Sequence, residues 1–251
     1  MTTDERKQKI LEILNAEGTV RVAALSKLFG ISEVTIRTDL TDMEYKGLLS
    51  RVHGGAIRSY KPYYNMNLNQ RMTTNQSEKK IIANKIVKMI ENHDTIMLNS
   101  GTTTLHAFRM FPPSLTLSIV TNSIQIALEG ADNPNYNIIL LGGHINSNYQ
   151  FTFGDDAINQ LKNYHADKLI LSVDGVDIKN GFSTYYDKEA EIDRIMINNS
   201  NFKIIAADRS KFCRTALSKI SDLSTADCIV TNAEIPKDMK EKIIEKGITI
   251  Y

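Results

Sequence analysis

The stretch SEVTIRTDLTDMEYKGLLSRVHGGA, residues 32–56, decides how the first part of the chain folds. Ile36, Leu40 and Met43 recur at the spacing of one helical face, so a helix there would turn all three inward. A three-residue turn, GIS, precedes this helix, and its last residue, Ser32, is placed to cap the helix N-terminus. The stretch therefore predicts a capped helix that packs one face against a core.

The outer face of this predicted helix carries small and polar side chains. Upstream, residues 3–16 and 21–29 each place apolar side chains on one helical face. A helix, a short turn and a second helix with such an outer face are typical of the helix-turn-helix, whose second helix enters the major groove of DNA. The candidate DNA-contacting residues on this second helix are Ser32, Val34, Thr35, Arg37, Thr38 and Thr41.

Residues 48–59, LLSRVHGGAIRS, alternate in polarity and turn at Gly54-Gly55, which indicates a β-hairpin. A hairpin directly behind a recognition helix forms a wing. Arg51 and His53 on this wing are placed to reach phosphates or a minor groove. The alternative is a three-helix bundle with a solvated hairpin in some other kind of protein.

Composition adds bounds on the class of protein. The length of 251 residues suits a small domain plus a medium one, and the net charge of +1 means that any DNA footprint depends on where the charges lie. No apolar run approaches the roughly 20 residues of a membrane span, so we expect a cytoplasmic protein with no membrane partner. The two cysteines, Cys213 and Cys228, match no metal-ligand spacing, and we expect neither a metal nor a cofactor.

After about residue 75, short apolar runs such as TIMLN and DKLILSVDG alternate with helical stretches such as DKEAEIDRIMINNS. This alternation predicts parallel βαβ units, so the second domain should be a mostly parallel α/β domain. Residues 59–76 are rich in Asn, Thr and Tyr and are interpreted as a linker, and Ser77 is expected to cap the helix that follows. The predicted domains are 1–58 and 77–251.

The segment NSGTTTLHAF, residues 99–108, directly follows the predicted strand TIML. A strand, a glycine with hydroxyl residues and then a helix would place backbone N–H groups and hydroxyls around a phosphate or carboxylate. The segment lacks the lysine of a Walker loop, and a well-capped helix without a ligand is the alternative. The candidate effector-binding residues here are Asn99, Ser100, Gly101, Thr102, Thr103 and Thr104.

Other polar residues follow other predicted strands, and in open α/β sheets ligands bind beyond the carboxyl ends of the strands. Carboxylates for hydroxyls and a lysine for phosphate make a sugar-phosphate pocket, although each segment alone could be a surface turn. These further effector-binding candidates are Asn122, Ser123, Gly142, Gly143, Asp174, Gly175, Asp177 and Lys211.

Residues 30–56 closely resemble the winged helix-turn-helix signature of the DeoR family of bacterial transcription regulators. That signature reads roughly S-x-x-T-I-R-R-D-L, followed after a few residues by G-x-L-x-R-x-H-G-G-A, and this chain matches it through TIR, DL and GLLSRVHGGA. Thr38 departs from it, because the family usually carries a second arginine there. The change removes a base or phosphate contact of a kind that contributes about 1–3 kcal/mol.

The second domain resembles the effector domain of the same family. GTTT, VTNS, LLGG, DGVD and ADRSKF occur in family order along the chain. The resemblance implies a fold like that of ribose-5-phosphate isomerase and the sensing of phosphorylated sugars or related metabolites. It also implies that residues 101–104 hold the phosphate, that Asp174 and Asp177 meet sugar hydroxyls, and that Lys211 supplies positive charge.

Two hypotheses follow. The first is a repressor of a carbohydrate-use operon, a homo-oligomer (dimer or tetramer), whose binding to double-stranded operator DNA is modulated by a phosphorylated sugar or sugar alcohol. Asn99 and Asn232 stand where the family often has aspartate, which allows for an effector other than the commonest ones. This hypothesis needs no catalytic residue, and we favour it.

The second hypothesis is a sugar-phosphate isomerase-type enzyme, since DGVD resembles the DGADE run of ribose-5-phosphate isomerases. Asp174, Asp177, Glu189 and Lys211 would then be the candidates for proton transfer. The DGADE run ends in an acidic residue, and this chain has Ile178 at that position.

Overall fold

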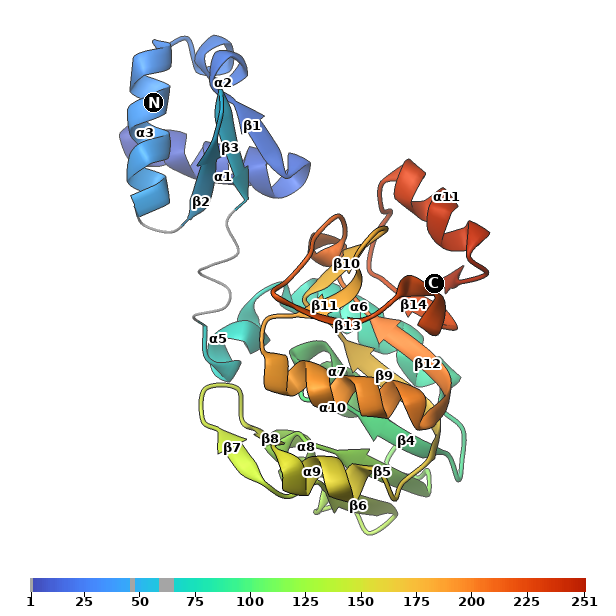
Figure 1. Ribbon diagram of the computed structural model, residues 1–251. Coiled ribbons are helices and arrows are strands. Elements are labelled where there is room, and N and C mark those ends of the chain that lie inside the picture. Colours follow the sequence, from blue (N-terminus) through green and yellow to red (C-terminus); the bar gives the residue numbers. More distant parts are fainter. Residues whose placement is uncertain (1, 46–47, 59–65) are drawn as a thin grey trace. The chain divides into compact units, whose positions relative to one another are not determined.

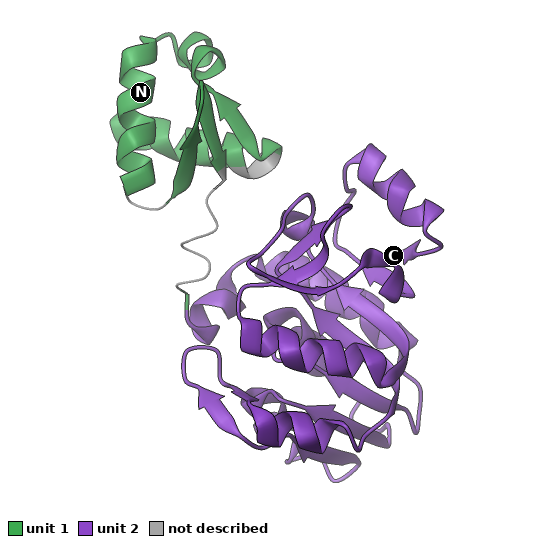
Figure 2. Ribbon diagram, in the orientation of Figure 1, with its two compact units in different colours: residues 1–66 green, residues 67–251 purple. Residues whose placement is uncertain are grey.

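The computed structural model describes residues 2–45, 48–58 and 66–251 (Figure 1). The chain forms two compact units, residues 1–66 and 67–251 (Figure 2). Within the described ranges, no helix is both long enough and apolar enough to span a membrane.

In its described residues, unit 1 combines three helices with a three-stranded antiparallel sheet of order β1-β3-β2. Its elements are α1 (Thr3–Glu17), β1 (Thr19–Arg21), α2 (Val22–Phe29), α3 (Glu33–Tyr45), β2 (Leu49–Val52) and β3 (Gly55–Arg58). The predicted helices and hairpin are confirmed, while strand β1 has no counterpart in the prediction. Leu28, one of the apolar residues in 21–29, does not share the buried face of α2, since its side chain is 64% exposed.

Helix α3 begins and packs as its sequence predicts. The Thr35 backbone N–H donates to Ser32 Oγ at 3.1 Å, which satisfies one of the free donors at the helix start. Ile36, Leu40 and Met43 are fully buried in the core of unit 1, where Ile10 and Leu14 of α1 also lie. The apolar spacing of α3 therefore fixes which face of the helix remains outside.

The segment predicted as a linker contains structure that belongs to unit 2. Residues 59–65 lie outside the described ranges, but Leu68–Thr73 form helix α5, which Asn67 and Gln70 close at its start by a reciprocal capping box. Helix α6 (Gln76–Ile86) starts before Ser77, and Ser77 does not cap it: its hydroxyl donates to Glu78. The capping pair Asn67 and Gln70 therefore allows a helix to form in a segment whose polar composition predicted a linker.

Unit 2 is built on a seven-stranded sheet of order β15-β14-β12-β9-β4-β5-β6, in which every neighbouring pair is parallel. The predicted α/β class is confirmed. The strands are β4 (Thr95–Leu98), β5 (Leu117–Thr121), β6 (Tyr136–Leu140), β9 (Ala166–Ser172), β12 (Ser200–Ala206), β14 (Cys228–Val230) and β15 (Thr249–Ile250).

Smaller elements complete unit 2. Two further sheets consist of β7 (His144–Asn146) with β8 (Phe151–Phe153), and of β10 (Gly175–Asp177), β11 (Gly181–Thr184) and β13 (Ser218–Ser221). The remaining helices are α7 (Thr102–Phe108), α8 (Ile124–Gly130), α9 (Asp155–Leu161), α10 (Asp187–Asn198) and α11 (Lys237–Glu245), with single 3-10 turns η1 (Val87–Met89), η2 (Arg209–Lys211) and η3 (Leu223–Thr225).

The sheet is buried on both faces, which explains why its strands are nearly continuous apolar runs. Alternate residues of β9 point to opposite faces: Ile170 joins the core beneath α6 and α7, whereas Leu169 and Leu171 join the core beneath α9, α10 and α11. The carboxyl ends of the strands thus open between two helical layers (Figure 1). The polar residues that follow β4, β9 and β12 lie at this edge.

Candidate functional site

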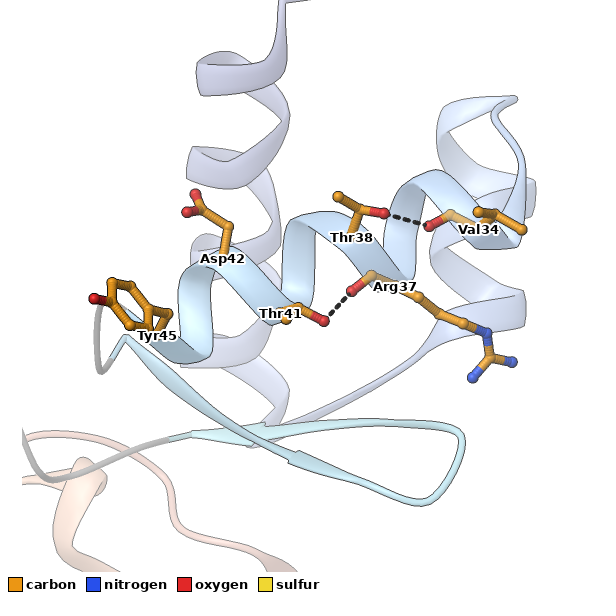
Figure 3. A pocket seen from close by; sticks show the side chains of 6 residues that line it. All are labelled: Val34, Arg37, Thr38, Thr41, Asp42 and Tyr45. Atoms are coloured by element: carbon orange, nitrogen blue, oxygen red, sulfur yellow. Dashed lines mark hydrogen bonds between the residues drawn. The ribbon is translucent and has the colours of Figure 1, made fainter.

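The outer face of α3 is exposed along its length and forms an open groove in unit 1. Figure 3 shows its lining side chains, which point away from the core of the unit. They are Val34, Arg37, Thr38, Thr41, Asp42 and Tyr45. Four of these six residues are predicted DNA contacts.

The start of α3 holds its polar side chains in defined positions. The hydroxyls of Ser32 and Thr35 are 2.9 Å apart, and Arg37 Nη2 lies 3.0 Å from Glu33 Oε2 in an exposed ion pair. Thr38 donates its hydroxyl to the Val34 carbonyl, as Figure 3 shows, so its methyl group remains available on the outside. A helix surface of this kind offers one guanidinium, hydroxyls and small apolar groups, which are the contacts that read base edges.

The predicted wing is attached to α3 by hydrogen bonds. Arg51 Nη1 donates to Thr41 Oγ1 at 2.7 Å, and the Arg51 backbone N–H donates to Glu44 Oε1 at 2.7 Å. His53 lies exposed at the turn between β2 and β3. The structure therefore brings Arg51 and the recognition helix together, and it leaves the tip of the hairpin open to solvent.

Two features of this face were missed by sequence reasoning. Asp42 lies in the groove, where its charge is balanced by Lys7 of α1 at 2.5 Å, and Tyr45 exposes 91% of its surface. Behind the face, Arg6 binds both carboxylate oxygens of the buried Asp39, at 2.6 and 3.2 Å. This bidentate pair fixes α3 on α1. The spacing within α3 could not indicate either partner on α1.

In unit 2 the candidate residues converge on Asp174, which lies just after β9. Its Oδ1 atom is 3.2 Å from Arg71 Nη2 of α5 and 3.3 Å from Lys211 Nζ of η2. Its Oδ2 atom accepts bonds from the Tyr185 backbone N–H and the Thr184 hydroxyl, at 3.2 and 3.3 Å. Three distant segments of unit 2 therefore meet at one buried carboxylate.

Electrostatics keep this carboxylate ionised. Burial alone would raise the pKa of Asp174, but the charges of Arg71, Lys211 and Arg214 outweigh burial and hold the pKa well below its usual range. All four side chains are buried. Three cationic side chains therefore act on the carboxylate of Asp174, and guanidinium and ammonium groups are the side chains that bind anions such as phosphate.

Glu189 on α10 extends the cluster toward the GTTT loop. Its two carboxylate oxygens accept bonds from the hydroxyls of Thr184, at 2.6 Å, and Ser100, at 3.2 Å. Burial raises the pKa of Glu189, and repulsion from the negative Asp174 raises it further. Ser100, Glu189, Thr184 and Asp174 thus form one connected group, in which the two carboxyl groups share the single hydroxyl hydrogen of Thr184.

Asp193, one turn further along α10, lies in the same buried region. Its pKa is raised well above the usual range by burial and by the charge of Glu189. Asn99 Nδ2 donates to Asp193 Oδ1 at 3.3 Å, while Asp193 Oδ2 has no hydrogen-bond partner among the described residues. Asn99 also donates to the Ser172 carbonyl and accepts from the Ser172 N–H. An aspartate at position 99 would place a second carboxyl group beside that of Asp193 and would lack the amide N–H that donates to it.

The hydroxyl loop has a mainly internal hydrogen-bond pattern. Thr104 donates to the Gly101 and Asn99 carbonyls at 2.6 and 2.9 Å, and Thr102 and Thr103 are buried at the start of α7. A Cβ atom on Gly101 would lie 1.7 Å from Ser172 Oγ, so only glycine fits there. The loop therefore packs tightly on the end of β9, next to Ser100, Glu189 and Asp193.

Other predicted ligand residues have structural partners. Ser123 caps α8, and the buried Asn122 donates to the Thr152 carbonyl. Gly142 donates to Gln160, and Gly143 lies so close to the Phe153 carbonyl that a Cβ would clash at 2.5 Å. These contacts hold Ser123, Gly142 and Gly143 in place, whereas Asn122 Oδ1 is buried with no hydrogen-bond partner among the described residues.

Two members of the DGVD run are also held by the fold. Gly175 packs against the Arg214 carbonyl, where a Cβ would approach to 2.6 Å. Asp177 lies at the β10–β11 turn, where its Oδ1 accepts from the Lys179 and Asn180 backbone N–H groups and from the Asn180 amide. Asp174 therefore lies at the cluster, whereas the Asp177 carboxylate closes a turn.

Sequence reasoning overlooked Arg71 and Arg214 as site residues and considered Glu189 only for catalysis. Arg71 fell in the presumed linker, and its only local signal was the capping pattern of α5 around it. Nothing near Arg214 in sequence indicates its burial. Tyr149, whose ring lies 4.8 Å from the Arg71 guanidinium, was overlooked as well.

Comparison with known families assigns both parts of the chain. The model for a DeoR-like helix-turn-helix domain matches residues 6–61, and the model for a DeoR C-terminal sensor domain matches residues 74–233. Together they cover both compact units.

Similar proteins extend along nearly the whole chain. An Escherichia coli O157:H7 protein described as an aga operon transcriptional repressor is 33% identical over 250 residues, 99% of this chain and 93% of its own. The glycerol-3-phosphate regulon repressor of Escherichia coli K12 is 28% identical, covering 100% of this chain and 99% of its own. The solved structure of ribose 5-phosphate isomerase A from Methanocaldococcus jannaschii matches 55% of each chain with 17% identity and a TM-score of 0.41.

Proposed function

The chain belongs to the DeoR family of DNA-binding transcription regulators, and we propose that its unit 2 gates operator binding by taking up a phosphorylated sugar or sugar alcohol at the Asp174 cluster. The observation that carries this proposal is the convergence of Arg71, Lys211 and Arg214 on a single buried carboxylate. Cationic side chains beside hydroxyls and carboxyls match a phosphate on one side and sugar hydroxyls on the other.

The chemistry of relatives supports the same class of ligand. One of them is named for the regulon of glycerol-3-phosphate, a phosphorylated polyol. In this chain Ser100 and the loop 101–104 would meet the phosphate together with Lys211, while Asp174 and Glu189 would accept bonds from ligand hydroxyls. Asn122, Ser123, Gly142, Gly143, Gly175 and Asp177 would support the walls of the site, since their contacts are internal.

In unit 1, the outer face of α3 would enter the major groove and the β2–β3 hairpin would lie along the backbone. Arg37 is the strongest candidate for a base contact, because its guanidinium has only an exposed ion pair to exchange for a guanine. Arg51 and His53 would approach phosphates. Operator half-sites usually follow a two-fold axis, so the active species would be a homo-oligomer, a dimer or a tetramer.

We further propose that the site binds its ligand without turning it over. The carboxylate of Asp177, which an isomerase reading would use for proton transfer, accepts three hydrogen bonds within its own turn. Incubation with ribose 5-phosphate should therefore yield no ketose. Ketose formation that disappears in a Glu189→Gln variant would replace this proposal by the enzyme hypothesis.

Fluorescence anisotropy tests the regulator directly. The full chain is titrated onto labelled DNA from upstream of its own gene, with excess nonspecific competitor and a panel of sugar phosphates and their unphosphorylated parents. Specific binding that one phosphorylated compound alters at least tenfold is the expected result. Specific binding that no compound alters would reject the effector site, and binding no tighter than to random DNA would reject the operator function.

Lys211 provides the matching variant. Lys211→Met keeps an apolar stem in the buried position and removes the charge that faces Asp174. The response to the phosphorylated compound should fall, while operator binding without it should stay as in the parent protein. Lys219→Met, at an exposed ion pair of the same unit, serves as the control. An equal response in both variants would remove Lys211 from the site.

A further inference from the structure

Helix α5 is the first element of unit 2, and its first residue, Leu68, comes two positions after Met66, where unit 1 ends. It is only six residues long. Helices this short do not persist in water without tertiary contacts, because nucleation is unfavourable and few internal hydrogen bonds form. The position of α5 therefore depends on what holds it to the rest of unit 2.

Arg71 attaches α5 to the buried carboxylate of Asp174. Its side chain and that of Asp174 are 10% and 4% exposed, and the guanidinium also stacks 4.8 Å from the ring of Tyr149. The two partners of the ion pair are 103 residues apart in sequence. A single side chain thus connects α5 to the centre of the proposed effector site.

Other contacts of α5 lie away from Asp174: Leu68 is buried, and Met72 packs against the core beneath α6 and α7. The Leu68 backbone N–H donates to the Asn148 carbonyl at 2.8 Å, near the β7–β8 hairpin. Lys79 Nζ binds the Arg71 and Thr74 carbonyls at the C-terminal end of the helix, at 2.5 and 2.6 Å. Lys79 fixes where α5 ends. Among the described residues of α5, Arg71 is the one whose side chain contacts the Asp174 carboxylate in the proposed effector site.

The other partners of Asp174 would allow Arg71 to leave its ion pair with Asp174 and bind an anionic ligand instead. The oxygen that binds Arg71 also binds Lys211, and the other oxygen has the Thr184 hydroxyl and the Tyr185 N–H. Asp174 would remain stabilised if Arg71 left it, so an anion that attracts the guanidinium need not expose an unpaired carboxylate. A phosphate is such an anion, since its oxygens accept bidentate bonds from arginine.

We propose that Arg71 is a positioning residue that reports ligand binding to the connection between the units: a bound anion draws its guanidinium from Asp174, and helix α5 loosens or moves. This rests on the proposed effector site. Six helical residues span about 9 Å, at roughly 1.5 Å each, whereas six extended residues span up to about 20 Å. Loosening α5 lengthens the connection to unit 1, and a longer connection lowers the effective concentration at which two DNA-binding units meet paired half-sites.

Hydrogen exchange of the full chain, with inorganic phosphate as the probe, tests this proposal. In the wild type, phosphate should raise exchange of the amides of residues 68–74 at least threefold while it slows exchange at residues 99–104. In Arg71→Gln, exchange of the same helix should be raised about tenfold before phosphate is added, and phosphate should change it no further. Arg71→Lys keeps the charge and should restore part of the response. Arg109→Gln, at an exposed ion pair on unit 2, should behave as the wild type.

The outcomes separate the two proposals. Protection of residues 99–104 with no change in α5 would keep the effector site and overturn the role of Arg71. Wild-type exchange of α5 in Arg71→Gln would also overturn it. Absence of any phosphate response in unit 2 would reject the effector site itself, and the signal assigned to α5 with it. A purely structural Arg71 would raise exchange in the variant yet leave the phosphate response of α5 absent in the wild type, and this result also counts against the proposal.

Discussion

The outer face of α3 and the Asp174 cluster use arginine in opposite ways. Arg37 on α3 and its partner Glu33 are each 48% exposed, so water screens their attraction and either side chain can leave the other at small cost. Arg71 and Asp174 are almost fully buried, where each charge depends on its neighbours. The first arrangement suits a surface that must bind different charges on DNA, and the second suits a site whose occupancy alters the structure around it.

The largest expected effect tests the buried side of this comparison. Asp174→Asn removes the counter-charge of Arg71, Lys211 and Arg214, and breaking a buried pair of this kind costs about 3–5 kcal/mol. Urea denaturation followed by circular dichroism should show this loss in the transition of unit 2. Glu129→Gln, at the half-exposed pair with Arg109, should lose far less. Equal losses in the two variants would mean that burial does not distinguish the two kinds of ion pair.

The exposed side is tested by Arg37→Ala. We expect operator affinity to fall by about 1–3 kcal/mol, or roughly five- to 150-fold, because a guanidinium contact to a base is lost. The urea midpoint of unit 1 should hardly change, since the pair with Glu33 is exposed. Anisotropy on operator DNA and on random DNA measures the change and its specificity. Unaltered operator affinity would place the reading of bases elsewhere on α3.

The pH dependence of stability sharpens the description of the buried cluster. Burial and the charge of Glu189 raise the pKa of Asp193 well above its usual range, so the native state keeps a proton that the unfolded chain loses near pH 4. Stability is therefore lost as pH rises from that value toward the native pKa, by about 1.4 kcal/mol for each unit between the two. Asp174 acts in the opposite sense, because its lowered pKa removes stability only as pH falls.

Asp193→Asn should abolish the contribution of Asp193. Relative to the wild type, the variant should be more stable at pH 8 than at pH 5, as measured by urea denaturation at both values. Glu189, whose pKa is also raised, leaves a residual slope in the variant. Parallel stabilities at the two pH values would show that Asp193 is ionised in the native protein.

The smallest effect concerns the wing. Arg51→Ala should weaken binding to all DNA sequences modestly and flatten the dependence of log affinity on log salt by about one unit, because one phosphate contact is lost. Arg51 also donates to Thr41 on the recognition helix, so a minor loss of specificity should accompany the change. DNA titrations of the wild type and the variant at several salt concentrations measure this slope. An unchanged slope would mean that Arg51 does not contact a DNA phosphate.

Local patterns in the sequence predicted most of the architecture, although not strand β1 or helix α5. The inward face of α3, the Ser32 cap, the hairpin at Gly54-Gly55 and the parallel sheet all follow from periodicities and turn signals that act within a few residues. The family signature in residues 30–56 likewise lies in one continuous stretch. The predicted DNA and effector contacts stay predictions, although the structure brings Asp174 and Lys211 together and places Asp177 at a turn.

Sequence patterns thus predicted the class of each fold and the DeoR family, and both are confirmed. The pairing of the buried polar groups became visible only in the folded protein. Arg71 pairs with Asp174, Glu189 with the hydroxyls of Ser100 and Thr184, and Asn99 with Asp193. The difference comes from how far apart in the sequence the interacting residues lie. Helix and strand patterns reflect neighbours one to four residues away, whereas a buried charge is governed by whichever distant segments the packed sheet and helices bring within about 4 Å of it.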